Sequence, residues 1–278
     1  MKLQILKQVT SVYVSIFLVI SPTLSQAKKI TPDGTTNTKI DVSRTGIPIV
    51  NIANPSTSGL SHNKFKDYNV NANGLILNNS MLDAQQLKSG EYIQGNKHLS
   101  RHATVILNEV TSTNRSYING VTEIAGQRAD LIIANPNGMS INGASFVNTS
   151  NLTLTSGKAN VSNGIINSFS VSSGDISIDG EGLNTINQDS TYIYAQSLKV
   201  NAAINAKNLD VKLGNNEIDA STNKITSSSN ANVNLLLDAS SLGGMYANRI
   251  VLVGTSKGVG VNLPPEVKAS LGWYYNQC

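Results

Sequence analysis

The chain has 278 residues, of which 40% are hydrophobic, 14% charged and 5% aromatic. This composition excludes a highly charged disordered tail and a heptad coiled coil. The formal net charge at pH 7 is only +4, and no stretch concentrates Lys and Arg on one face. We therefore expect no nucleic-acid-binding domain.

The chain contains 35 asparagines and 22 glycines, and Ser and Thr are abundant. Asn and Gly tolerate positive φ and favour turns, whereas Ser and Thr suit strand surfaces. Windows rich in Ala, Leu and Glu with a 3.6-residue period are missing. The composition therefore predicts an all-β chain that turns often.

The first 27 residues have the pattern of a secretory signal peptide. Lys2 and Lys7 make a positive start, residues 12–20 (VYVSIFLVI) an apolar core, and residues 25–27 (SQA) a cleavage site with small residues. The apolar core is too short to span a bilayer comfortably, so a membrane anchor is the weaker interpretation. We expect a secreted chain that begins at residue 28.

Short apolar or alternating segments bounded by Gly, Asn or Asp follow one another along the mature chain, as strands joined by turns do. In chain order the predicted strands are residues 75–77, 104–107, 131–133, 152–154, 176–178, 198–200, 209–213, 233–237 and 250–253. Leu152, Ile176 and Leu198 each begin an apolar–polar–apolar triplet, at spacings of 24 and 22 residues. Such a period favours the stacked coils of a parallel β-helix. At about 22 residues per coil we expect about eleven coils.

An antiparallel sandwich or barrel is the alternative architecture, because Asn-Gly pairs favour two-residue hairpins. Four such pairs occur, at Asn73-Gly74, Asn119-Gly120, Asn142-Gly143 and Asn163-Gly164. The period favours the β-helix, with part of the chain paired in antiparallel strands.

The sequence offers few candidate active-site residues. His62, His98 and His102 are interpreted as surface side chains, because their surroundings predict loop and strand and no metal-binding spacing. No P-loop, Rossmann or G-x-S-x-G motif is present. Asp175 and Asp179 leave open a polysaccharide-cleaving β-helix, although carboxylates beside a Gly-rich turn are first of all turn residues. We expect no enzyme activity, no metal and no cofactor.

One tetrapeptide fits a type I β-turn at every position, and it directly follows the predicted strand 131–133: Asn135, Pro136, Asn137 and Gly138. The first Asn can bond the backbone, Pro presets φ, and Gly suits the last position. Taken alone, the string indicates a good turn and nothing more.

In its context, residues 126–157, the tetrapeptide resembles the amino-terminal secretion domain of two-partner-secretion exoproteins. The resemblance is to the filamentous haemagglutinin type and especially to the contact-dependent growth inhibition toxins. It covers about residues 45–265. Supporting blocks lie at residues 68–79 and 242–261, and a third contains Asn108, Glu109, Val110, Thr111 and Ser112.

The sequence departs from the family pattern in two places. The second turn of the family, Asn-Pro-Asn-Leu, corresponds here to Asn96, Lys97, His98 and Leu99. Loss of the Pro makes that turn less rigid. Many relatives carry a Cys pair after the first turn, where this chain has Asn142 and Ser145.

The resemblance implies an all-β fold, a right-handed parallel β-helix with short antiparallel strands outside it. It also implies a non-enzymatic secretion-recognition domain of an adhesin or toxin. The expected partner is an outer-membrane barrel transporter, whose periplasmic domains recognise the unfolded chain before it is exported to the cell surface or the medium. A target-cell surface is a second candidate partner. A polysaccharide-active enzyme and a direct cell-adhesion module remain alternatives.

The expected domain organisation is a signal peptide at residues 1–27, a secretion domain at 28–265 and an atypical tail at 266–278. Family members usually continue into a long repeat-bearing filament, so we expect this chain to be a truncated form. A β-helix without a polar cap has an open edge, which we expect the aromatic tail to cover in part.

Overall fold

The computed structural model describes residues 29–277, so the expected signal peptide lies outside the described residues. Every helix or strand assigned within residues 29–277 is a strand, which confirms the all-β prediction. Across the same residues, no helix combines the length and apolarity that crossing a membrane requires.

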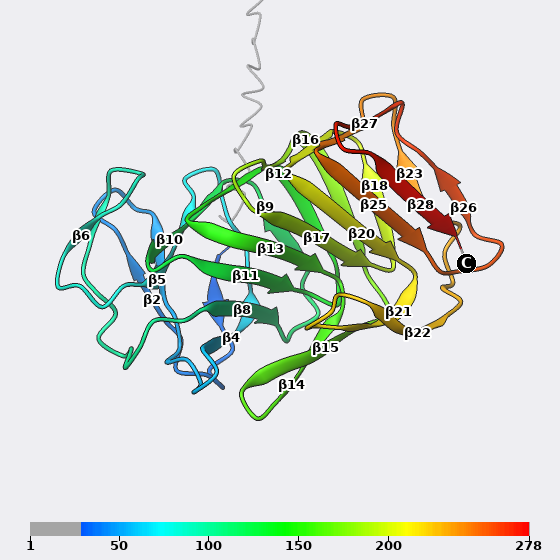
Figure 1. Cartoon of the computed structure of the whole chain (residues 1–278). Helices are drawn as coiled ribbons and strands as arrows, with labels where there is room; N and C mark the ends of the chain where they lie inside the picture. Colours follow the sequence, from blue (N-terminus) through cyan, green and yellow to red (C-terminus); the bar gives the residue numbers. More distant parts are fainter. Residues whose placement is uncertain (1–28, 278) are drawn as a thin grey trace, which may run out of the picture.

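One face of the molecule is a nine-stranded sheet (Figure 1). Its first pair is antiparallel and every later pair is parallel. In spatial order it contains β1 (Thr31–Pro32), β4 (Leu60–Asp67), β8 (Val105–Val110), β11 (Ala129–Ala134), β13 (Thr149–Thr155), β17 (Ser190–Ala195), β20 (Asn208–Leu213), β25 (Arg249–Gly254) and β28 (Trp273–Gln277).

A thirteen-stranded sheet forms the remaining faces. Its main path is β2 (Lys39–Val42), β3 (Pro48–Asn51), β5 (Leu75–Asn79), β10 (Val121–Gly126), β12 (Met139–Val147), β16 (Asp175–Thr185), β18 (Ser197–Val200), β23 (Leu235–Ala239) and β26 (Gly260–Asn262). Beside this path lie β9 (Ser116–Ile118), β19 (Ala203–Ala206), β24 (Gly244–Ala247) and β27 (Glu266–Ala269).

The long strands β12 and β16 each serve two faces, because both bend at glycines. Residues 139–141 of β12 pair with β9, whereas residues 145–147 pair with β10. Between them Gly143 has φ 78°, and in β16 Gly180 and Gly182 have φ 54° and 75°. Positive φ is accessible to Gly without the steric penalty of a Cβ atom. The sheet therefore turns a corner, and together with the nine-stranded sheet it closes a parallel β-helix.

Two smaller sheets lie outside the β-helix. A four-stranded antiparallel sheet contains β14 (Lys158–Ser162), β15 (Ile165–Val171), β21 (Asn215–Asp219) and β22 (Ile225–Ser229). A two-stranded one contains β6 (Gln85–Gln86) and β7 (Tyr92–Ile93). These strands confirm the expected antiparallel segments outside the helix.

The interior of the β-helix is a stack of apolar side chains in register. Ile133, Leu154, Ile193, Val211 and Leu252 are successive partners in five neighbouring strands, and none is more than 2% exposed. Full burial of such a side chain contributes about 1.5–3 kcal/mol. A second apolar cluster lies between the nine-stranded and four-stranded sheets and includes Phe169, Tyr194 and Ile218.

The predicted period was only half right. Ile176 does stack on Leu198, but Leu152 lies in the other sheet, between Leu131 and Thr191. The chain leaves the helix as the β14–β15 hairpin between Leu152 and Ile176, so their spacing does not measure one coil.

The predicted coil number of about eleven was too high. In residues 29–277 the nine-stranded sheet has eight strands in parallel register, from β4 to β28, and each belongs to one coil. The strands outside the helix use the remaining residues.

Of the four Asn-Gly pairs, Asn163-Gly164 makes a hairpin turn, with φ 51° and 71°, between β14 and β15. Asn142-Gly143 instead bends β12. The antiparallel sandwich is therefore wrong for the body of the molecule. Within the expected tail, β27 pairs with β24 and β28 with β25.

Candidate functional site

Residues 135–138, here called the motif turn, join β11 to β12 at a corner of the β-helix. The Gly138 amide donates to the Asn135 carbonyl at 2.9 Å, which closes the predicted β-turn. Gly138 has φ 85°. A Cβ atom there would lie 2.2 Å from the Asp175 carbonyl oxygen, so only Gly fits.

The side chain of Asn135 points into the molecule and is fully buried. Its Nδ2 donates to the carbonyl of Asn114 and to Oγ of Ser116, both at 2.9 Å. Its Oδ1 accepts from the backbone amide of Asn137 at 2.9 Å. The buried amide is thus paired on both ends, as a polar group inside a protein must be.

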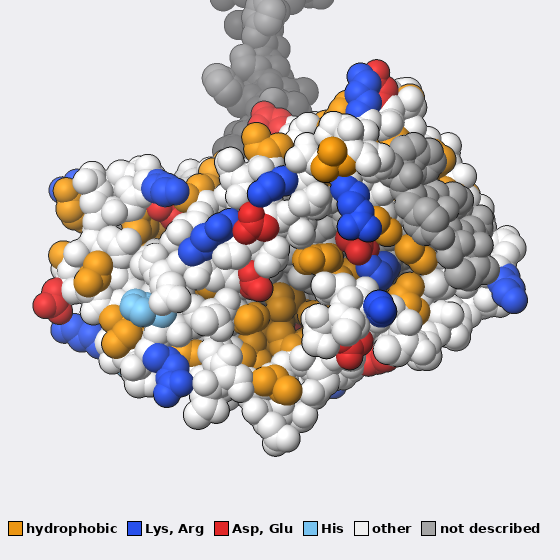
Figure 2. Space-filling view, viewed as in Figure 1, with side chains coloured by type: hydrophobic (Ala, Val, Ile, Leu, Met, Phe, Trp, Pro, Cys, Tyr) orange, Lys and Arg blue, Asp and Glu red, His pale blue; other side chains and the backbone are white. Residues whose placement is uncertain are grey.

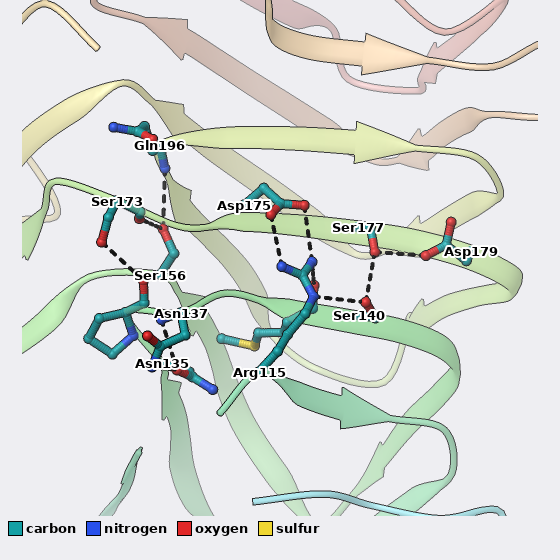
Figure 3. Close-up of polar contacts among 12 residues, drawn as sticks. Arg115, Asn135, Asn137, Ser140, Ser156, Ser173, Asp175, Ser177, Asp179 and Gln196 are labelled. Atoms are coloured by element: carbon teal, nitrogen blue, oxygen red, sulfur yellow. Dashed lines mark hydrogen bonds and ion pairs between the residues drawn. The ribbon is translucent and has the colours of Figure 1, made fainter. Parts of the chain in front are cut away.

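Asn137 connects the motif turn to the preceding coil. Its Nδ2 donates to the carbonyl of Ser112 at 2.7 Å and to Oδ1 of Asn135 at 3.1 Å (Figure 3 shows both Asn side chains). Ser112 ends the sequence block 108–112. The structure therefore brings the motif turn and this block into direct contact.

The rest of that block binds the coil before it. Nδ2 of Asn108 donates to the hydroxyl of Tyr68 at 3.0 Å, and burial raises the pKa of Tyr68. Glu109 is nearly buried and lies 2.8 Å from Nε2 of His62. These contacts make the block a tie between coils.

The end of the block reaches further back in the chain. Val110 lies in the apolar interior, and the exposed Thr111 donates to Oδ2 of Asp33 at 2.9 Å. Ser112 donates to the carbonyl of Lys66 at 2.5 Å.

The second turn has the same architecture as the motif turn. Leu99 donates its amide to the Asn96 carbonyl at 3.1 Å, and His98 donates its amide to Oδ1 of Asn96 at 3.1 Å. Nδ2 of the buried Asn96 donates to the carbonyls of Ile52 and Asn78, at 2.9 and 3.2 Å. Lys97 and His98 are exposed. In both turns the first Asn accepts from the amide two residues later and donates through Nδ2 to groups outside the turn, whether or not Pro follows it.

A family model described as the TPS secretion domain matches residues 28–271. The chain belongs to this family. TPS stands for two-partner secretion, so the resemblance found in the sequence is confirmed.

Two similar relatives are far longer than this TPS secretion domain. It is 43% identical over 259 residues to the "16S rRNA endonuclease CdiA" of Enterobacter cloacae subsp. cloacae, covering 91% of this chain and 8% of that protein. It is 39% identical over 232 residues to the "tRNA nuclease CdiA-2" of Burkholderia pseudomallei, covering 82% of this chain and 7% of that protein. The chain therefore spans less than a tenth of these relatives.

The TPS secretion domain is also similar to a solved structure, the crystal structure of the filamentous hemagglutinin secretion domain. The TM-score is 0.77 at 35% identity, and the match covers 84% of this chain and 80% of that one. The likeness confirms the predicted β-helix fold.

The two carboxylates that left a polysaccharide-cleaving enzyme open, Asp175 and Asp179, bond different partners. Asp175 pairs with Arg115 at 2.8 Å, whereas Asp179 lies 2.7 Å from Oγ of Ser177 and accepts from Asn201 at 2.8 Å. In residues 29–277, no three His, Cys, Asp or Glu side chains are placed to hold a metal ion. The three histidines are likewise separate: besides His62, His102 Nδ1 lies 2.8 Å from the Asn79 carbonyl oxygen, and His98 is exposed.

A hollow of about 370 Å³ lies between the nine-stranded and four-stranded sheets, and hydrophobic side chains show in its floor (Figure 2). Leu60, Ile132 and Phe169 line it together with Asp130 and Asn151, which bond each other at 2.9 Å. No residue of either turn lines this hollow.

Sequence reasoning missed the residues that hold the motif turn from outside it. Asn114, Arg115 and Ser116 lie two to four residues after the block 108–112, and all three contact the turn or the strand after it. Their position at the end of the same coil could have indicated this role. Ser173 and Gly174 carried no such signal, because they reach the turn only after a hairpin that leaves the helix.

Proposed function

We propose that this chain is a non-enzymatic secretion-recognition domain, which directs export through a dedicated outer-membrane barrel transporter. Its signal peptide, residues 1–27, is removed on the way to the periplasm. The periplasmic domains of the transporter then recognise residues 28–265, and the domain reaches the cell surface or the medium. Residues 266–278 are a C-terminal tail, of which residues 266–277 supply β27 and β28.

The observation that carries this proposal is the inward direction of the motif side chains. The side-chain amide of Asn135 donates to Asn114 and Ser116, and that of Asn137 donates to Ser112. In the folded domain these amides are occupied, so a partner can contact them only before the coil closes. The motif therefore has two roles. The transporter recognises it in the unfolded chain, and it ties neighbouring coils together in the folded domain.

The sheet-rich chain suits a partner that binds by strand addition. An unfolded segment can add its backbone to an exposed sheet edge, and main-chain hydrogen bonds then give affinity without a charged interface. After export, each coil that stacks buries its apolar column and opposes return through the pore.

Export of the full chain tests the proposal. The chain is expressed with and without a two-partner-secretion transporter, and mature protein is measured in the periplasm and medium. We expect Asn137→Ala to lower transporter-dependent export severalfold and Asn201→Ala to leave it unchanged. Asn201 is a matched control, because its side chain lies in another turn and bonds Asp179. Equal export of Asn137→Ala and wild type, or export without the transporter, contradicts the proposal.

Signal-peptide removal has its own test. Mass spectrometry of the exported chain should give an amino terminus at Lys28. A chain that keeps residues 1–27 contradicts the assignment.

The nuclease activities named for the relatives are properties stated for those much longer proteins. For this chain we propose none, and the separated carboxylates Asp175 and Asp179 support that assignment. Incubation of purified chain with acidic polysaccharide and Ca²⁺ should release no unsaturated or reducing ends. Release of either would favour the polysaccharide-active alternative.

A further inference from the structure

Arg115 reaches the motif turn from the preceding coil. It lies in the loop before β9, and its side chain is 24% exposed. Its guanidinium donates to the carbonyl of Met139 at 2.6 Å and to Oγ of Ser140 at 3.0 Å, just after the turn. Nη1 and Nη2 donate to the two carboxylate oxygens of Asp175 at 2.8 and 3.0 Å (Figure 3). One side chain thus joins three successive coils.

Asp175 belongs to a segment that covers the motif turn from the other side. Ser173 donates its hydroxyl to the carbonyl of Pro136 at 3.0 Å. A Cβ atom on Gly174 would lie 2.6 Å from that same carbonyl oxygen. The backbone of residues 173–175 is therefore packed directly on the turn.

Arg115 and Asp175 both lie close to Gly138. A Cβ atom on Gly138 would lie 2.2 Å from the carbonyl oxygen of Asp175 and 2.5 Å from Nη1 of Arg115. The turn is clamped between residues 112–116 of the earlier coil and residues 173–175 of the later one.

The covering segment is distant in sequence from the turn. After β13 the chain leaves the helix, forms the β14–β15 hairpin at residues 158–171, and only then returns as residues 173–175. Asp175 can therefore contact Arg115 only when the chain beyond the hairpin has returned to the β-helix.

We propose that Arg115 and Asp175 are positioning residues that lock the motif turn, so that the turn becomes rigid only when the chain through residue 175 has joined the β-helix. The inference rests on the proposed function, because it defines when the motif stops being available to a transporter. A bidentate Arg–carboxylate pair suits this task, since it fixes direction as well as distance.

A second ion pair of the domain offers a matched control. Arg128 donates to the carbonyl of Thr149 and to Oδ2 of Asp189, so it also spans coils. Its side chain is 45% exposed and that of Asp189 52%. An exposed pair of this kind contributes little to rigidity.

Hydrogen exchange in the purified full chain tests the lock. The amides of Asn137, Gly138 and Ser116 report on the turn, because they donate to Asn135 Oδ1, Asn135 O and Gly138 O respectively. In Asp175→Ala we expect these amides to exchange about tenfold faster or more, as local opening does when its anchor is lost. Ile133 amide exchange should stay as in wild type, and Asp189→Ala should change none of them.

Conservative and reciprocal variants separate positioning from general stability. Arg115→Lys keeps the positive charge but loses the bidentate guanidinium, so the amides of the motif turn should exchange faster in a chain that still folds. The double variant Arg115→Asp with Asp175→Arg should restore part of the protection. Unchanged exchange at Gly138 in both Asp175→Ala and Arg115→Lys, or a rise equal to that at Ile133, overturns the inference.

The order of locking is tested by pulsed exchange during refolding. Gly138 should gain protection together with Ile176 of β16, and later than Ile133 of β11. Protection of Gly138 in step with Ile133 overturns the inference. Neither measurement involves a transporter, so the two proposals can fail separately. The exchange results can overturn the lock while Asn137→Ala still lowers export, or they can support the lock while Asn137→Ala leaves export unchanged.

Discussion

Nδ2 of Asn137 donates to the backbone carbonyl of Ser112 at 2.7 Å, and this bond joins the two sequence blocks that first pointed to a secretion domain. Asn135 makes a similar contact with Asn114 and Ser116, which lie two and four residues after Ser112. The motif is therefore a tie between neighbouring coils, and its side chains face the protein.

Asn135 should matter more to stability than Asn137. Asn135→Ala leaves Oγ of Ser116, the carbonyl of Asn114 and the amide of Asn137 without their partner. We expect the free energy of unfolding to fall by about 2–3 kcal/mol. Asn137→Ala removes mainly the bond to Ser112, so about 1 kcal/mol is expected. Urea unfolding of the full chain measures both, and an equal or reversed ranking contradicts the burial argument.

Gly138→Ala should be among the most damaging changes at the site. A positive φ costs a residue with a Cβ atom about 1–2 kcal/mol, and the overlap with Asp175 and Arg115 adds about 1–3 kcal/mol. Gly34 is the control, because its φ is 88° and a Cβ atom there meets nothing within 4 Å. Gly34→Ala should lose only about 1–2 kcal/mol. Thermal unfolding compares the two, and equal losses contradict the clamp.

Lys97→Pro should stabilise the second turn. Asn96 already makes the bonds that Asn135 makes before Pro136, so the turn accepts the same geometry. A Pro that fits the native backbone adds about 0.4–1 kcal/mol by restricting the unfolded chain. Urea midpoints of Lys97→Pro and wild type check this. A destabilised variant would mean that the backbone at residue 97 cannot adopt the Pro conformation.

The turn between β21 and β22 should weaken in acid. Hydrogen bonds from Ser221 and Thr222 lower the pKa of Asp219 from 3.8 to about 2. A lowered pKa means that the folded state favours the carboxylate, so its contribution is complete above pH 4 and is lost as the pH falls towards 2. Asp219→Asn should show a smaller loss of stability between pH 4 and 2 than wild type. Urea midpoints across that range measure it, and identical slopes contradict the assignment.

Phe169 should hold the four-stranded sheet on the β-helix. Its ring is 3% exposed and lies 5.9 Å from that of Tyr194. Phe169→Ala should cost about 3–4 kcal/mol and expose the β14–β15 hairpin to protease. Ile165 of the same hairpin is 45% exposed, so Ile165→Ala should cost less than about 0.5 kcal/mol. Limited proteolysis with mass spectrometry locates the cuts, and cuts spread over the β-helix core would contradict a local effect.

The strands were predictable because their patterns are local. Apolar triplets such as Ile176-Ser177-Ile178 alternate inward and outward residues, and Asn and Gly mark the turns between them. The coil count was not predictable from the same pattern. A hairpin such as β14–β15 carries the same alternation as a coil strand, so only pairing partners distinguish the two.

By itself the sequence determined the all-β class, the two Asn-led turns and the family, since each rests on residues close together in the chain. The tertiary structure decided which face each strand joins and which distant groups surround the motif. Arg115 and Asp175 are 60 residues apart and meet because β9, β12 and β16 stack as neighbours, although the β14–β15 hairpin is looped out between them. The physical reason is that a local pattern specifies strands and turns. Which strands stack on one another depends on how many residues are looped out of the β-helix between successive coils.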